Sequence, residues 1–398
     1  MQHSILILLI LQVALSLLNT STTHAAPLLE LNITITRGGQ KKSDKVYHWE
    51  VDSFPSSLSQ LEVPLQLETP LKRGRDQFDI VRDPVLIKSQ SQCLSKATLP
   101  RVLRSLYPAN SYARSKDRHP SFTSTPLPKE AFSGPASRYI RLEYQMLFKP
   151  GFNWVKGGKL PGALIGSEKG CNAGCSGGGS AENCFSTRMM WREGGQGELY
   201  LYAAKSVYFP EQKPETCRGS LNKRSSEALA LLEKRRIDAV RIPEDDEYES
   251  YEGGPNGALM KRAMSDSCLQ GMRVNISEGA RNMCNPNYGI SIGRGGGFQF
   301  KAGQWHNVTQ IVRVNSKGKA VRDGYLAVYL DNNPVIVAQD LVLLKNGYDP
   351  KKDPAGQQVK FMFSSFFGGA TKDYATPNNQ WIAWKGFKMT TSSSNIWE

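Results

Sequence analysis

Apolar and polar residues alternate along several short segments of the chain, which are separated by turns containing glycine or proline. The clearest segment is 139–148, where Ile140, Leu142 and Phe148 fall on one face and Arg141 and Glu143 on the other. This alternation is typical of a half-buried strand. Further strands are predicted at 185–191, 198–203, 305–314, 325–330 and 361–367. Their recurrence between turns predicts an all-β sandwich.

Two regions interrupt this rhythm. Residues 26–90 have one strand pattern, at 29–36, followed by a stretch rich in Lys, Arg, Ser and Pro, so we expect a loosely structured N-terminal extension. The main domain then covers 91–398. Within it, 205–283 contains a short predicted helix at 226–236, and its 13 Lys and Arg balance 13 Asp and Glu. A neutral, irregular segment of this kind indicates a surface insertion, and the basic excess of the chain lies elsewhere.

The first residues of the chain indicate export. Residues 1–18 are almost wholly apolar, and a small-residue site ends at Ala25, which predicts a signal peptide over 1–25. The alternative is an uncleaved anchor, but the apolar run is rather short for a membrane span of about 20 residues. Sequons at Asn32, Asn275 and Asn307 agree with export. We therefore expect a secreted, extracellular protein with no stable membrane association after cleavage.

Composition narrows the choice of partner and cofactor. The formal net charge is +14, which suits nucleic acid, an anionic membrane or an acidic polysaccharide, although such charge can also serve only solubility. Because an exported protein meets acidic polysaccharides outside the cell, we expect an acidic polysaccharide as the partner and no binding of nucleic acid. The seven cysteines predict up to three disulfides and one free thiol. Cys171, Cys175 and Cys184 lack both a nearby histidine and the zinc-ribbon spacing, so we expect no metal.

Two neighbouring predicted strands carry polar residues at alternate positions. Ser186, Arg188 and Arg192 share one face of the first strand, and Glu198, Tyr200 and Tyr202 share one face of the second. The turn 194–197 would join them as a hairpin, which places both polar faces side by side. A third cluster, 156–162, holds Lys159 between glycines that let the backbone approach a ligand. Each cluster also has a structural alternative. The polar residues of the two strands could only form stabilising cross-strand pairs on a solvated hairpin, and 156–162 could be a tight turn with an exposed lysine.

These residue types suit β-elimination of a uronate. The reaction removes the C5 proton, so an enzyme must neutralise the neighbouring carboxylate, supply a base and protonate the departing C4 oxygen. Lys and Arg provide preorganised positive charge. A tyrosine whose pKa is lowered by cations can act as the base, and the same or a second tyrosine can act as the acid. No metal or organic cofactor is needed.

The same residues resemble polysaccharide lyase family 14, which contains alginate lyases and glucuronan lyases. The similarity lies in the motifs FNWVKGGKLPG (152–162), CSGG (175–178), CFSTRMMWR (184–192), GELYLY (197–202), YGISIGRG (288–295), GQW (303–305) and FFGG (366–369). The resemblance implies a β-jelly roll with a concave substrate groove. It also implies catalytic roles for Lys159, Ser186, Arg188, Tyr200 and Tyr202. The insertion 205–283 is longer than the family leads us to expect.

Two other classes of function remain open. A jelly roll that only binds acidic glycans would use the same face, but no catalytic position is lost here. A glycoside hydrolase needs two facing carboxylates, and Glu198 is the one obvious acid on this face. Arg192, Glu198, His306 and Gln310 are further candidates for substrate binding. For His306 a surface or capping role is favoured, and a groove position would make it a second base candidate. For Gln310 a hydrogen bond at the core edge is an equal alternative. We expect a monomer.

Overall fold

The computed structural model describes residues 29–37, 40–68, 71, 74–89, 99–113, 119–125, 127, 131, 138–166, 175–176, 181–210, 272–276, 280–285, 289–349, 359–369 and 371–397. The expected signal peptide at 1–25, the expected helix at 226–236 and most of the insertion 205–283 lie outside these ranges. Within the ranges, no helix is long and apolar enough to cross a membrane.

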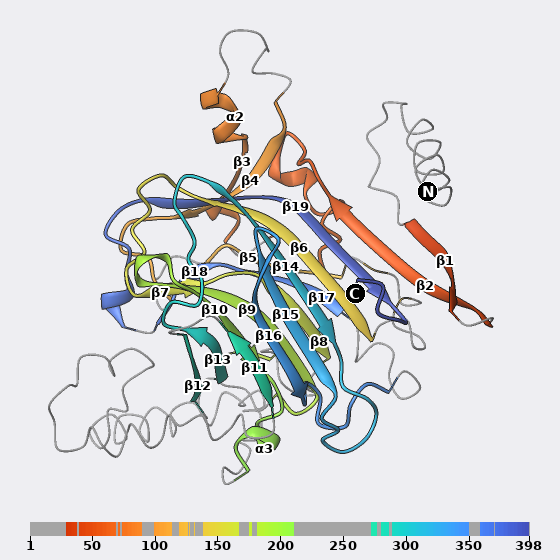
Figure 1. Cartoon of the computed structure of the whole chain (residues 1–398). Coiled ribbons are helices and arrows are strands. Elements are labelled where there is room, and N and C mark those ends of the chain that lie inside the picture. Colours follow the sequence, from red (N-terminus) through yellow and green to blue (C-terminus); the bar gives the residue numbers. More distant parts are fainter. Residues whose placement is uncertain are drawn as a thin grey trace, which may run out of the picture.

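Two antiparallel sheets form the molecule (Figure 1). The first, sheet A, has the strand order β1-β2-β19-β6-β14-β15-β16-β11, with β4 also pairing β19 and β3 pairing β4. Its strands are β1 (Leu29–Arg37), β2 (Gln40–Val51), β3 (Phe78–Arg82), β4 (Arg101–Tyr107), β6 (Tyr139–Phe148), β11 (Arg273–Ile276), β14 (Trp305–Arg313), β15 (Gly324–Leu330), β16 (Asn333–Leu341) and β19 (Gln380–Ser392).

The second, sheet B, has the order β12-β13-β10-β9-β8-β17-β5, and a short pair, β7 with β18, joins it through β9. Its strands are β5 (Ser121–Ser124), β7 (Gly157–Lys159), β8 (Gly162–Gly166), β9 (Cys184–Arg192), β10 (Gly197–Tyr202), β12 (Arg281–Asn285), β13 (Gly289–Arg294), β17 (Val359–Ser364) and β18 (Phe366–Phe367). The helices are short: α2 (Pro84–Ser89), α3 (Lys205–Tyr208) and the 3-10 turns Leu58–Gln60, Arg75–Gln77, Glu193–Gly195 and Lys372–Tyr374.

The alternating segments of the sequence form the strands predicted for them, except that the segment 361–367 divides into β17 and β18. The segment 139–148 is β6, and its apolar face, from Ile140 to Phe148, is buried between the sheets. The predicted strands at 185–191 and 198–203 are β9 and β10, joined by the predicted turn. Fully burying one large apolar side chain contributes about 1.5–3 kcal/mol, so the period of two dictates which face turns inward. The predicted all-β jelly-roll sandwich is confirmed.

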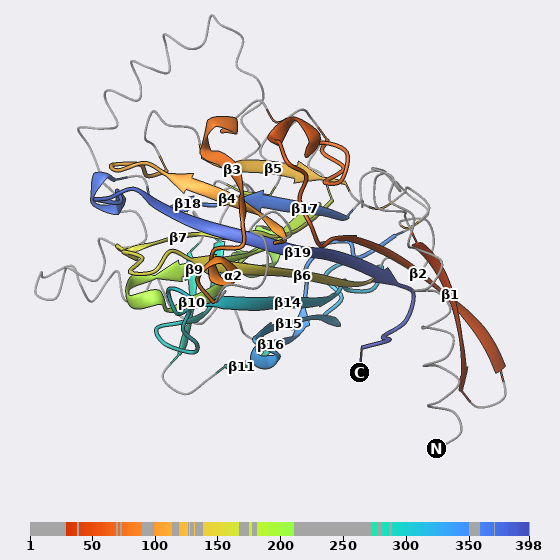
Figure 2. The same cartoon turned by 90° about the horizontal axis from the view of Figure 1, so that it is seen from above.

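The N-terminal extension differs from the prediction of a loose segment over 26–90. Strand β2 pairs with β19 inside sheet A, and β3 pairs with β4. Trp49, Phe54 and Leu61 are buried in the main core. These apolar residues are widely spaced among polar ones, so the composition of the segment did not indicate that it contributes to the core. The β1–β2 hairpin, red in Figures 1 and 2, projects from the edge of the sandwich in both views.

Candidate active site

The outer face of sheet B carries the polar residues predicted to lie together. Across the β9–β10 pair, Tyr202 lies opposite Ser186 and Tyr200 opposite Arg188. Their neighbours Phe185, Met189, Trp191, Leu199 and Leu201 face the opposite way, into the core between the sheets. Directly opposed side chains on one face have Cβ atoms about 4.5–5.5 Å apart. The hairpin therefore gathers a hydroxyl, a guanidinium and two phenols into one patch.

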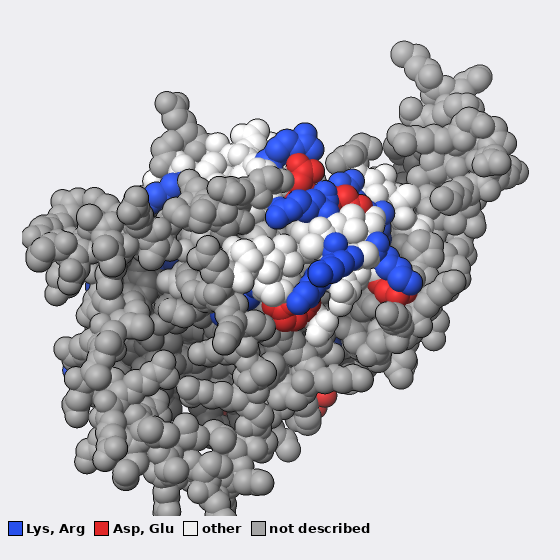
Figure 3. Space-filling view, turned by 90° about the horizontal axis from the view of Figure 1, so that it is seen from below, with Lys and Arg blue, Asp and Glu red and all other residues white. Residues whose placement is uncertain are grey.

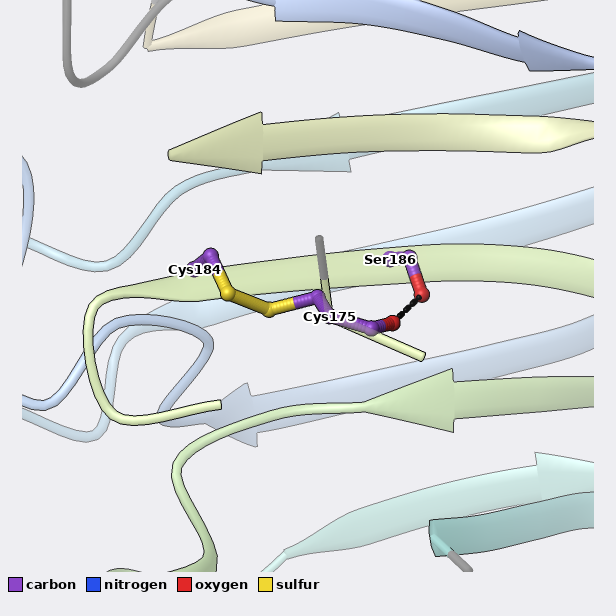
Figure 4. The surroundings of a disulfide bond; sticks show 3 residues. All are labelled: Cys175, Cys184 and Ser186. Carbon is purple, nitrogen blue, oxygen red and sulfur yellow. Dashed lines mark hydrogen bonds between the residues drawn. A yellow bond between two sulfur atoms is a disulfide. The ribbon is translucent and has the colours of Figure 1, made fainter. Parts of the chain in front are cut away.

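A disulfide holds a second segment against this patch (Figure 4). Cys175 is bonded to Cys184, which lies two residues before Ser186 on the same face of β9. The Ser186 hydroxyl donates a 2.8 Å hydrogen bond to the Cys175 carbonyl oxygen. Because a hydroxyl has one proton, Ser186 uses its donor here and presents only lone pairs to another group. This bond is one of the disulfides that the cysteine content predicts.

Lys159 reaches the patch from the short strand β7. It lies opposite Met190 of β9, and its Nζ is 2.9 Å from the Met190 sulfur. The same Nζ lies 3.1 Å from the centroid of the Tyr200 ring. The glycine before it leaves room for a core side chain, because a Cβ on Gly158 would lie 2.1 Å from the Trp191 ring. The missing side chain thus lets β7 pack against the protein itself, which fixes Lys159.

The two tyrosines form the centre of the patch. Their rings are 5.3 Å apart at an angle of 66°. Lys159 lies over Tyr200, and the Arg188 guanidinium carbon lies 5.5 Å from the centroid of the Tyr202 ring. Nearby cations favour the charged phenolate form of a tyrosine. Both rings are almost fully shielded from solvent. In such a buried environment charge interactions are stronger than in water.

Arg188 differs from the other cations of the patch. It is 4% exposed, and its Nε has no hydrogen-bond partner among the described residues. A buried guanidinium atom without a partner is rare, because burying a polar group without a hydrogen bond costs free energy. Arg188 therefore has donor capacity left for an incoming carboxylate.

Arg192, by contrast, is paired. Its Nε and Nη2 donate to the two carboxylate oxygens of Glu198, at 3.0 and 2.8 Å. The Ser291 hydroxyl of β13 donates to the same carboxylate at 3.1 Å. Burial would raise the pKa of Glu198, but the charges of Arg192, Arg294 and Lys159 hold it below its usual range. Glu198 is therefore ionised, and both its oxygens are occupied.

Two of the predicted substrate contacts lie elsewhere. Gln310 is fully buried on β14 of sheet A, and its side-chain oxygen accepts a 2.6 Å hydrogen bond from Thr187 across the core. His306, also on β14, accepts the backbone N–H of Lys301 at Nε2 and lies 2.7 Å from the Asp331 carboxylate at Nδ1. Thr187 faces the core because it alternates with Ser186 and Arg188. Neither side chain lies on the polar face of sheet B.

Arg294 is a member of the patch that sequence reasoning missed. Simple alternation along β13 would place it on the face opposite Ser291. Gly293, however, has φ +82°, a left-handed conformation, and a Cβ there would contact Ile336 of the other sheet. The alternation therefore shifts by one residue, and the charge of Arg294 acts on Glu198. Gly293 was the sequence feature that could have indicated a change in the alternation, but only its backbone angle shows that the change occurs.

Charges elsewhere on the described surface are mixed. Figure 3 shows, on the face seen from below, Lys and Arg side chains lying beside Asp and Glu side chains. Pairs such as Arg138 with Asp323, at 2.6 Å, are of the partly exposed kind that contributes about 0–1 kcal/mol. Within the described part of the chain, no group of three or more His, Cys, Asp or Glu side chains could hold a metal ion.

The fold and the patch define a β-jelly roll that presents cations and phenols on the outer face of one sheet. The family model for polysaccharide lyase 14 matches residues 95–227 and 266–387, and the chain belongs to this family. It is thus a polysaccharide lyase. No protein of curated function matches the chain.

The chain is similar to several solved structures, among them two alginate lyases. The PL-14 alginate lyase from Aplysia kurodai is 23% identical, with a TM-score of 0.51, over 86% of this chain and 98% of that one. The alginate lyase vAL-1 from Chlorella virus is 16% identical, with a TM-score of 0.43, over 80% of this chain and 94% of that one. At this identity the first structure supports the jelly-roll fold alone.

Proposed function

We propose that this lyase cleaves a uronic-acid-containing glycan, of the alginate or glucuronan type, by metal-independent β-elimination. The observation that carries the proposal is the arrangement of two phenols between two cations on one shielded face. Such a face neutralises a carboxylate and moves protons, and it needs nothing further for an elimination.

Arg188 binds the uronate carboxylate in this scheme, because its guanidinium is buried and has an unused donor. Arginine suits the task, since its planar fork matches a carboxylate and keeps its charge. Neutralising the carboxylate makes the neighbouring C5–H more acidic. Ser186, whose proton is already donated to the Cys175 carbonyl, accepts a hydrogen bond from the substrate or from a tyrosine.

Tyr200 is the base in the scheme, because the Lys159 ammonium over its ring stabilises the phenolate. The phenolate takes the C5 proton, the C–H electrons form the C4=C5 double bond, and the C4–O bond breaks. Tyr202, 5.3 Å away ring to ring, gives its proton to the departing oxygen. Proton transfer between the two phenols then restores the starting state. General acid–base catalysis of this kind contributes about 10²–10⁴-fold.

The test is to incubate the protein with alginate, polymannuronate, polyguluronate and glucuronan, and to follow the ultraviolet absorbance of the new double bond. We expect absorbance to rise on at least one of them. Binding of these polymers without any rise in absorbance would instead identify a non-catalytic glycan-binding protein.

We also propose that the protein is secreted. The support is the apolar run over 1–18 followed by the small-residue site at Ala25. Expression in a secreting host tests it: the protein recovered from the medium should begin near Ala26. Retention in the membrane fraction with an intact N-terminus would support the uncleaved anchor.

A further inference from the structure

Glu198 is a negative charge placed where a polyanionic substrate is expected. It lies on the outer face of β10, two residues before Tyr200, and is fully buried. A buried carboxylate repels a uronate unless it is neutralised by other protein groups. The groups that neutralise the Glu198 charge must therefore come from the protein itself.

Protein groups already occupy the carboxylate. Arg192 binds one oxygen through Nε and the other through Nη2, and the Ser291 hydroxyl binds the second oxygen as well. Paired donation of this kind is the strongest form of hydrogen bond between side chains. The sequence had suggested that Glu198 contacts substrate. With both oxygens bound by protein groups, Glu198 is poorly suited to that role.

The register places Glu198 in line with Lys159. Met190 of β9 lies opposite Glu198 on one side and opposite Lys159 on the other. Two strand spacings separate the backbones of Glu198 and Lys159, which is about 10 Å. The ammonium of Lys159 lies over the Tyr200 ring, so Glu198, Lys159 and Tyr200 interact electrically through a medium of low polarity.

We propose that Glu198 is a positioning residue, which holds Arg192 against the sheet and adjusts the pH at which the Tyr200 base ionises. The inference rests on the proposed elimination. Arg192 of β9, Lys159 of β7, and Ser291 and Arg294 of β13 all face the carboxylate.

The sign of the effect follows from the charges. An ionised Glu198 opposes formation of the Tyr200 phenolate, and it offsets part of the Lys159 charge that favours the phenolate. Removing the negative charge lets the phenol ionise at lower pH. Glu198 and Tyr200 are two residues apart on one face of β10, so their backbones are about 7 Å apart and their charged ends about 7–10 Å apart. At an effective dielectric constant of about 20, the shift is at least about one pH unit.

The experiment compares pH profiles of kcat/KM for the wild type, Glu198→Gln and Glu198→Asp. We expect the rising limb of the Gln variant to move at least about one pH unit lower, with kcat reduced and KM changed less than about threefold. The Asp variant, which keeps the charge, should return the limb towards its wild-type position. Ser291→Ala removes a donor but no charge, so its profile should not move.

Asp340→Asn is the matched control. It removes a carboxylate that pairs with Arg273 at 2.7 Å on sheet A, away from the patch, and should leave the profile unchanged. An unmoved profile with a raised KM in Glu198→Gln would overturn the proposal in favour of substrate contact. An unmoved profile with only a lowered melting temperature would overturn it in favour of a purely structural role.

A second readout separates this inference from the proposed function. If the wild type eliminates none of the uronans, the proposed function fails, but the Tyr200 phenol can still be titrated in the ultraviolet. The difference between each protein and its Tyr200→Phe variant isolates this phenol among the 15 tyrosines. A phenol that ionises at lower pH in Glu198→Gln than in the wild type supports the electrostatic link. Identical titrations overturn it, whatever the activity.

Discussion

Arg188 and Arg192 lie four residues apart on the same face of the same strand, yet the structure predicts opposite consequences when each is replaced. Arg188 has a buried guanidinium atom without a hydrogen-bond partner, whereas Arg192 forms a two-point ion pair with Glu198. Replacing each by methionine keeps an unbranched stem of similar length and removes the charge. The matched pair therefore isolates what each charge contributes.

The expected magnitudes follow from the partners. Arg188→Met removes a charge that no carboxylate of the described chain neutralises, so the free energy of unfolding should stay the same or increase. Activity should fall by about 10²–10³-fold, the usual loss when one preorganised group that stabilises developing negative charge is removed. Arg192→Met leaves Glu198 buried without its main partner. Breaking a buried pair in this way costs about 3–5 kcal/mol, and Lys159 and Arg294 moderate the loss towards the lower value.

Two assays check the pair together. Thermal unfolding should show Arg192→Met melting about 10 °C below the wild type, since each kcal/mol moves the midpoint of a domain of this size by about 2–4 °C. Arg188→Met should melt at or above the wild-type temperature. Kinetics on the uronan that the wild type cleaves best give the activities.

One pattern of results would refute the reasoning. If Arg188→Met is as unstable as Arg192→Met and loses activity only in proportion to its unfolded fraction, Arg188 is a structural residue. The unused donor would then have no bearing on carboxylate binding.

The remaining predictions concern the tyrosine base, the packing of β7, the disulfide and the absence of a metal. Tyr200→Phe should lower kcat by about 10²–10⁴-fold with little change in melting temperature, and a variant that keeps its activity would exclude this phenol as the base. Gly158→Ala should destabilise the protein by about 1–3 kcal/mol in urea unfolding, because its Cβ would lie 2.1 Å from the Trp191 ring; wild-type stability would show that the strand can shift. The double variant Cys175→Ser, Cys184→Ser should lose kcat and melt lower, since the segment that accepts the Ser186 hydrogen bond is released, whereas unchanged kinetics would show that the segment stays in place. A chelator should leave the rate unchanged, and a loss that added divalent ions restore would contradict elimination without a metal.

Local alternation was enough to predict the central hairpin and its faces. Strands β9 and β10 have a period of two with large apolar residues on one side, so Ser186, Arg188, Tyr200 and Tyr202 had to share the other side. The gain from burying the apolar face is large compared with any preference of the polar residues. The faces of such a hairpin can therefore be predicted without knowledge of the rest of the fold.

Long-range pairing escaped prediction. Strand β2 joins the sheet through β19, a partner more than three hundred residues away, and its segment has a polar composition. His306 and Gln310 also lie on a correctly predicted strand, β14, but that strand belongs to the other sheet. The period of two tells which residues share a face; it does not tell which sheet the strand enters.

The role of a charged residue on a known face depends on the strands beside it. Arg188 and Arg192 cannot be distinguished by period, residue type or burial. They differ because Glu198, from the neighbouring strand β10, binds Arg192, and Ser291 of β13 holds the same carboxylate in place. Arg188 keeps an unused donor. The residue that neutralises a cation determines which other cation is available for substrate. Under the proposed elimination, Glu198, which sequence reasoning placed among the substrate contacts, is instead the group that neutralises Arg192.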